Sequence, residues 1–114
     1  MDDCLFCRIR EGKIPAEKVH EDELVFAIKD INPQAPTHLL IIPHKHQETL
    51  MELETADRET IGTVFTVAGK LARERGLDKS GFRVVANCGS GAGQSVWHIH
   101  FHLLGGRGMK WPPG

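Results

Sequence analysis

Residues 98–102 read His-Ile-His-Phe-His, and this alternation constrains the fold more than any other stretch of the chain. Successive side chains of a strand point to opposite faces, so His98, His100 and His102 would share one face. A helix would distribute the same three side chains around its circumference. We therefore predict a strand over residues 96–104, at an edge of a sheet. Its core face would carry Trp97, Ile99, Phe101 and Leu103.

The rest of the chain reads as short strands around one long helix. Apolar residues recur at helical spacing between residues 55 and 75, and Gly76 follows as a stop signal. Strands joined by short loops around one helix predict an α+β fold with an antiparallel sheet. The length of 114 residues predicts one domain, 1–114. The shorter predicted elements are a helix over 4–11 and strands within 19–29, over 37–42 and over 82–87.

The net charge and the lengths of the apolar runs limit which partners and which cellular location we expect. The net charge of −1 gives no general attraction to nucleic acid or to an acidic membrane, so we expect neither as a partner. Residues 1–10 lack the apolar segment of a signal peptide, and the longest apolar run, residues 39–42, has the length of a strand. We therefore expect a cytoplasmic protein whose three cysteines are not disulfide-bonded.

A row of histidines on one strand face has three possible interpretations. One is a solvated polar face, and another is a metal site, because alternating histidines can supply two ligands to one ion. The third is catalysis by an imidazole with one nitrogen available for attack and the other hydrogen-bonded. A glycine-rich loop over residues 89–93 precedes the row and leads into Gln94 and Ser95. Its backbone N–H groups and these two side chains would be donors for phosphoryl oxygens, which favours catalysis.

Several segments together resemble the histidine triad (HIT) family. Residues 93–104 (GQSVWHIHFHLL) are similar to the family signature, and residues 30–38 (DINPQAPTH) are similar to its central segment. Leu-Leu-Gly-Gly-Arg at 103–107 and Trp-Pro-Pro-Gly at 111–114 resemble the histidine triad nucleotide-binding protein (Hint) branch. The resemblance implies one HIT domain over residues 1–114. It also implies about five antiparallel strands, one long and one short helix, and sheets joined across a homodimer.

The resemblance further implies the hydrolysis of purine nucleoside phosphoramidates, such as adenosine or guanosine monophosphate linked to an amine. His100 matches the middle histidine of the triad and would be the nucleophile, forming a nucleotidyl-histidine intermediate that water cleaves. His102 would orient and polarise the site, and His98 is a candidate for proton transfer. Ser95 would hydrogen-bond the leaving nitrogen, and Gln94 would lie near the phosphate.

Nucleoside binding follows from the same matched positions. Asp30 would accept the ribose hydroxyls, since a carboxylate is a bidentate acceptor suited to a diol. Asn87 would lie near the phosphate or leaving group, and Trp111 near the partner subunit's site. Lys110 stands where animal members often have a histidine, which leaves the preferred leaving group open. The base would be sandwiched by residues that composition alone would assign to the core: Leu5, Phe6, Ile9, Ile28 and Ile31.

Cys4 and Cys7 form a C-x-x-C pair, which alone indicates metal or redox chemistry. A redox motif normally follows a strand in a βαβ unit, which we do not predict here. Some bacterial HIT members carry a similar pair and bind zinc with it, and their other two ligands match His46 and His98. Such a site would be closed and structural, with two free thiols as the alternative. The other histidines and cysteine are expected outside this site: His20, His38, His44 and Cys88.

Two further functions compete with the phosphoramidase. A dinucleoside polyphosphate hydrolase would use the same triad, although the Trp-Pro-Pro-Gly ending argues against that branch. A non-enzymatic nucleotide-binding regulator is the other, although an intact triad with Ser95 argues against an inert protein. A hydrolytic metal centre on the three histidines would need a third protein ligand and an open coordination position.

Overall fold

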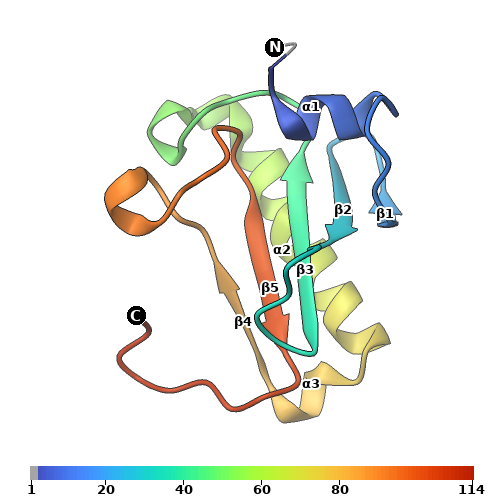
Figure 1. Cartoon of the computed structure of the whole chain (residues 1–114), viewed down its shortest axis with the longest axis vertical. Coiled ribbons are helices and arrows are strands. Elements are labelled where there is room, and N and C mark those ends of the chain that lie inside the picture. Colours follow the sequence, from blue (N-terminus) through green and yellow to red (C-terminus); the bar gives the residue numbers. More distant parts are fainter. Residues whose placement is uncertain (1–2) are drawn as a thin grey trace.

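Five strands form one antiparallel sheet in the order β1-β2-β3-β5-β4 (Figure 1). This computed structural model describes residues 3–114. An antiparallel sheet with one long helix confirms the predicted α+β class. The strand that carries His102, β5, lies between β3 and β4, so the predicted place of the histidine strand at an edge was wrong. The strands are β1 (Lys18–Glu21), β2 (Val25–Lys29), β3 (Thr37–Pro43), β4 (Phe82–Val85) and β5 (Phe101–Gly105).

One long helix, α2 (Arg58–Glu74), packs across one face of the sheet and matches the helix predicted between 55 and 75 (Figure 1). It ends before Gly76, whose φ of 72° is in the left-handed region that favours glycine. The short helix α1 (Leu5–Arg10) has Cys4 as its N-cap. In the part of the chain described, no helix is long and apolar enough to cross a bilayer. Shorter helical turns are α3 (Leu77–Ser80), η1 (Leu50–Glu52), η2 (Thr55–Asp57) and η3 (Ser90–Ala92).

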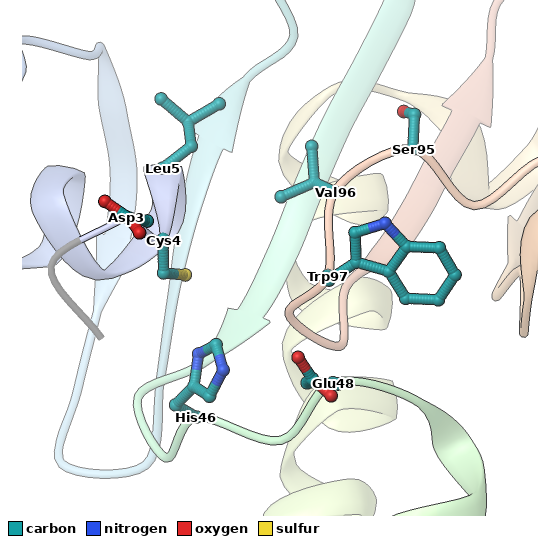
Figure 2. Close-up of a pocket in the computed structure, with 8 residues that line it drawn as sticks. All are labelled: Asp3, Cys4, Leu5, His46, Glu48, Ser95, Val96 and Trp97. Carbon is teal, nitrogen blue, oxygen red and sulfur yellow. The ribbon is translucent and has the colours of Figure 1, made fainter.

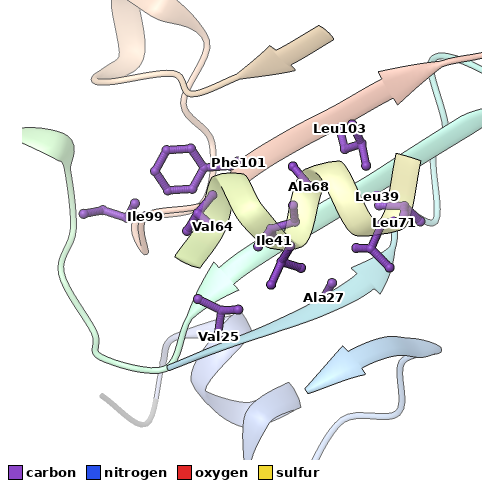
Figure 3. Close-up of a cluster of buried hydrophobic side chains, with 11 residues drawn as sticks. Val25, Ala27, Leu39, Ile41, Val64, Ala68, Leu71, Ile99, Phe101 and Leu103 are labelled. Carbon is purple, nitrogen blue, oxygen red and sulfur yellow. The ribbon is translucent and has the colours of Figure 1, made fainter. Parts of the chain in front are cut away.

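The main core lies between α2 and the sheet (Figure 3). Alternate residues of β2, β3 and β5 face the helix, as a period of two requires. Although Phe65 falls on the apolar side of the helix by its spacing, its side chain is half exposed, and Val67 is buried. Each large side chain buried here contributes about 1.5–3 kcal/mol of transfer free energy. The buried members are Val25, Ala27, Leu39, Ile41, Val64, Val67, Ala68, Leu71, Ile99, Phe101 and Leu103.

The opposite face of the same strands carries a smaller apolar cluster together with polar side chains. Helix α1 covers one end of this face, with Phe6 and Ile9 packed on the sheet. His102 is paired with Leu40 across β5 and β3, so both side chains project from this face. The cluster consists of Phe6, Ile9, Phe26, Ile28, Leu40 and Ile42.

The strand that we predicted over residues 96–104 begins only at Phe101. The first two histidines of the row, His98 and His100, therefore lie in an irregular segment before β5. Trp97 was predicted on the core face, and this was wrong, because its side chain is 44% exposed.

The proline that closes β3 explains the shorter strand. The His44 N–H donates to Leu24 O. In this register the backbone groups of even-numbered β3 residues form hydrogen bonds with β2, and those of odd-numbered residues form hydrogen bonds with β5. Pro43 therefore stands where an N–H would donate to residue 99, and proline has none. The ladder stops, and the Ile99 N–H donates instead to Gln47 O at 2.8 Å.

Candidate active site and metal cluster

A cavity of about 430 Å³ opens on the sheet face away from α2. One part of its lining is apolar, and the other carries ionisable and hydroxyl side chains. The apolar part contains all five residues expected around a base, although Ile31 is fully exposed there: Leu5, Phe6, Ile9, Ile28 and Ile31. The polar part contains Asp30, His38, Ser95, His100 and His102. The fold therefore brings most of the predicted nucleotide site together in one cavity.

The hydrogen bonds of His100 fix the form of its ring. Nδ1 lies 2.8 Å from the carbonyl oxygen of His98. A carbonyl can only accept, so Nδ1 carries a hydrogen and donates it, and Nε2 of the neutral ring keeps its lone pair. Burial lowers the pKa of His100, against the opposing effects of the His98 carbonyl and the charge of Asp30. The ring is thus held neutral with Nε2 unprotonated.

A chain of hydrogen bonds fixes His102 in the opposite form. The Gln34 N–H donates to Nδ1 of His38 at 3.0 Å, so the hydrogen of neutral His38 is on Nε2. That nitrogen lies 2.9 Å from Nδ1 of His102 and 3.4 Å from Oδ2 of Asp30. His102 Nδ1 therefore accepts, and its Nε2–H is a donor.

The protonated, cationic forms of His38 and His102 are both disfavoured. Burial, with His100 and His38 nearby, lowers the pKa of His102 to about 4. Burial also lowers the pKa of His38. His38, which the sequence leaves as a structural or a surface residue, is buried beside His102. Its role depends on the register between β3 and β5, which no local sequence pattern indicates.

The glycine loop uses most of its donors internally. The N–H groups of Ala92, Gly93 and Gln94 donate to loop carbonyls, and the Gly89 N–H donates to Oε1 of Gln94 at 2.8 Å. Gly93 permits this tight turn because its φ is 93°. The expected set of N–H donors for a phosphate is therefore largely occupied, and the Ser95 side chain remains at the cavity.

Three residues predicted to contact the ligand are not among those that line this cavity in residues 3–114. Gln94 is buried, and its Nε2 donates to Glu48 O at 2.6 Å and to Val96 O at 3.1 Å, so it braces the loop. Asn87 is outside the lining of the cavity as described over residues 3–114. Trp111 is 82% exposed on the C-terminal tail, where its expected contact concerns a partner subunit.

Cys4, Cys7, His46 and His98 form a second cluster, whose ligand atoms all lie within 4.8 Å of one another. A second cavity, of about 480 Å³, adjoins it, and Figure 2 shows Cys4, the N-cap of α1, and His46, from the loop after β3, facing the same space. Nδ1 of His98 is 3.2 Å from Cys4 Sγ, 3.6 Å from Cys7 Sγ and 3.1 Å from Nδ1 of His46. Cys7 Sγ is 3.5 Å from Nδ1 of His46.

These distances fit a tetrahedral zinc ion. Zinc bonds of about 2.3 Å to sulfur and about 2.0 Å to nitrogen, at tetrahedral angles, separate two nitrogens by roughly 3.3 Å, a nitrogen and a sulfur by roughly 3.5 Å, and two sulfurs by roughly 3.8 Å. The Nε2–H of His98 donates to Pro43 O at 2.7 Å, which leaves the Nδ1 lone pair directed at the thiols. The donor set of two thiols and two imidazoles therefore suits zinc in composition and in shape.

Burial explains how this cluster would behave without a cation. It lowers the pKa of His98 to about 4, so the imidazole is neutral and able to ligate. Burial and the neighbouring Cys4 thiol raise the pKa of Cys7 to about 11, and a bound cation would reverse that shift by stabilising the thiolate. His98 thus faces the cluster, and its ring and that of His100 both pack against Phe6.

Comparison with known proteins agrees with this geometry. The model of the HIT domain matches residues 11–109. The chain is 50% identical to a 14 kDa zinc-binding protein of Zea mays over 113 residues, covering 96% of this chain and 87% of that protein. It is 42% identical to the purine nucleoside phosphoramidase of Escherichia coli over 106 residues, covering 93% and 89%.

Solved structures show the same fold. A HIT family hydrolase from Legionella pneumophila superposes with a TM-score of 0.96 at 54% identity, covering 98% of this chain and all of that one. At this identity and coverage the likeness extends to the whole domain. The chain belongs to the HIT family, and its relatives include hydrolases of the Hint type.

Proposed function

We propose that this protein is a purine nucleoside phosphoramidase that attacks phosphorus with Nε2 of His100. The observation that carries the proposal is the 2.8 Å hydrogen bond from His100 Nδ1–H to His98 O, which leaves Nε2 unprotonated at the polar end of an apolar slot. The name of the Escherichia coli relative supports the same reaction class.

The substrate would bind with its base in the apolar part of the cavity and its phosphate at the histidines. Asp30 would accept the ribose hydroxyls. Its Oδ1 already accepts the Asn32 N–H at 2.8 Å, and a carboxylate keeps further lone pairs for a diol. The Nε2–H of His102 would donate to a phosphoryl oxygen and stabilise the charge that develops in the transition state.

The reaction would proceed in two displacements. His100 Nε2 forms a bond to phosphorus as the bond from phosphorus to the amine breaks, and the departing nitrogen takes a proton through the Ser95 hydroxyl. Water then attacks phosphorus, the bond to Nε2 breaks, and the proton lost by water replaces the one that the departing amine took through the Ser95 hydroxyl. The products are the nucleoside monophosphate and the free amine.

We further propose that zinc occupies the Cys4, Cys7, His46 and His98 cluster as a structural ion, since four protein ligands leave it no open position. The name of the Zea mays relative supports zinc binding. The protein is also proposed to be a homodimer, with Trp111 of each chain near its partner's site and able to influence which leaving group fits.

The test is the hydrolysis of a fluorogenic adenosine phosphoramidate by wild type and by His100→Ala, with a diadenosine polyphosphate as the competing substrate. We expect at least about a 10³-fold loss of kcat in the variant, because a covalent nucleophile has no substitute. The dissociation constant of adenosine monophosphate should change less than about threefold. Wild-type turnover in the variant would refute the nucleophile, and preference for the polyphosphate would refute the substrate class.

A further inference from the structure

We propose that the metal cluster also positions the nucleophile: a cation held by Cys4, Cys7, His46 and His98 fixes the orientation of His100. This inference rests on the proposed function, in which His100 attacks phosphorus. It makes the cysteines and His46 positioning residues for the reaction, beyond their contribution to the stability of the fold.

The first connection is His98, which takes part in both sites. Its ring is fully buried, with Nδ1 in the cluster and Nε2–H donating to Pro43 O at 2.7 Å. Its backbone carbonyl accepts the Nδ1–H of His100 at 2.8 Å. A bound cation would hold the ring from a second side, and through it the carbonyl that selects the reactive form of His100.

The second connection is α1. Cys4 and Cys7 flank Phe6, whose ring lies 5.9 Å from the ring of His98 and 5.0 Å from the ring of His100, edge to face in both pairs. With six residues, α1 is too short to be stable alone, so its position depends on what it is attached to. A cation would join the start of this helix to His46 and His98, and so keep Phe6 against His100.

Small displacements of a nucleophile have large effects on rate. A misplacement of about 1 Å can lower a rate by about 10²-fold, because attack requires close and aligned atoms. Removing the cation would release both the carbonyl and the aromatic ring that contact His100. The substrate can still bind by its base and ribose, so the loss falls on kcat more than on nucleotide affinity.

The experiment compares wild-type protein as loaded with zinc, after removal by a chelator, and after zinc is restored. It measures the imidazole ¹⁵N signals of His100 with adenosine monophosphate bound, the affinity for that nucleotide, and kcat at saturating phosphoramidate. We expect the stripped protein to lose the Nδ1–H signature of His100 and to show kcat about 10- to 100-fold lower. Restored zinc should recover both.

Matched variants separate positioning from simple bracing. His46→Ala should reproduce the stripped protein, whereas His46→Cys keeps a closed four-ligand site and should retain zinc and the His100 signals. Cys88→Ser, at a thiol outside the cluster, should behave as wild type. If His46→Ala does not fold, the comparison of stripped and restored wild type still tests whether the cation positions His100.

Several outcomes would overturn the inference. Wild type that binds no zinc would do so, as would stripped protein with unchanged His100 signals and unchanged kcat. Weaker nucleotide affinity with unchanged kcat would show that the cluster only braces α1. These results differ from failure of the proposed function, which would appear as full turnover in His100→Ala.

Discussion

The two faces of the sheet use the same strands for different purposes. Towards α2, alternate residues of β5 are Phe101 and Leu103, both buried among aliphatic side chains. Away from α2, the residue between them is His102, joined to His38 and adjacent to His100. The face towards α2 is held by apolar burial, whereas the other face combines a smaller apolar cluster with directional hydrogen bonds that set the tautomer of each ring. Neighbouring positions of one strand should therefore fail in different ways when altered.

The largest effect is expected on the helix face. Leu103→Ala removes a fully buried side chain and should lower the free energy of unfolding by about 2–5 kcal/mol, because the transfer energy is lost and a cavity remains. Chemical denaturation measures this change. The folded fraction should keep wild-type kcat, and a large loss of kcat in folded protein would break the separation between the faces.

The next effect is expected one residue away. His102→Ala should lower kcat by about 10²- to 10³-fold, because it removes a donor to the charge that develops on the phosphoryl oxygen. Single-turnover hydrolysis of the phosphoramidate measures it. The control is the denaturation midpoint, which should fall less than in Leu103→Ala; equal destabilisation by the two variants would contradict the comparison.

The faces should also differ in their response to acid. His102 has a folded pKa of about 4 against 6.5 unfolded, so the unfolded chain binds more protons between these values. Its contribution to stability is complete above pH 6.5 and is lost as the pH falls towards 4, by about 1–3 kcal/mol. Unfolding measured from pH 7 to pH 4 should show a smaller decline in His102→Ala than in wild type, whereas Leu103→Ala should keep the wild-type slope.

The smallest effect concerns binding at the rim of the cavity. Asp30→Asn should weaken the affinity for adenosine monophosphate by about tenfold, because a charged acceptor for the ribose hydroxyls is lost. Calorimetric titration measures it. The deoxyribose analogue, which lacks the 2′-hydroxyl, should lose less affinity in this variant. An equal loss for both nucleotides would contradict the prediction that Asp30 binds the ribose hydroxyls.

Local patterns in the sequence predicted the parts of the molecule that depend on period and on stop signals. The alternation around Phe101 placed apolar and histidine side chains on opposite faces, and Gly76 marked the end of the helix. The predicted start of the strand was wrong, because Pro43 interrupts the ladder on a different strand, although Ile99 still faces the core. A pattern within one segment carries no information about such a neighbour.

Details of the site that no local pattern in the sequence predicts depend on long-range pairing. His38 joins the site because the register of β3 and β5 brings it beside His102, 64 residues along the chain. Gln94 was expected at the phosphate, but carbonyls of Glu48 and Val96 use its amide. The metal ligands came from the resemblance, since spacing alone gave the C-x-x-C pair and could not select His46 over His44.

The connection after β3 limits how this site can change during evolution or design. Three consecutive residues of it are already engaged: His46 belongs to the metal cluster, Gln47 O receives the Ile99 N–H, and Glu48 O receives the amide of Gln94. Surface connections usually vary freely in length and composition. Here an insertion would shift the histidine segment and the glycine loop together, so this connection and those two segments must be inherited, or transplanted into another scaffold, as one unit.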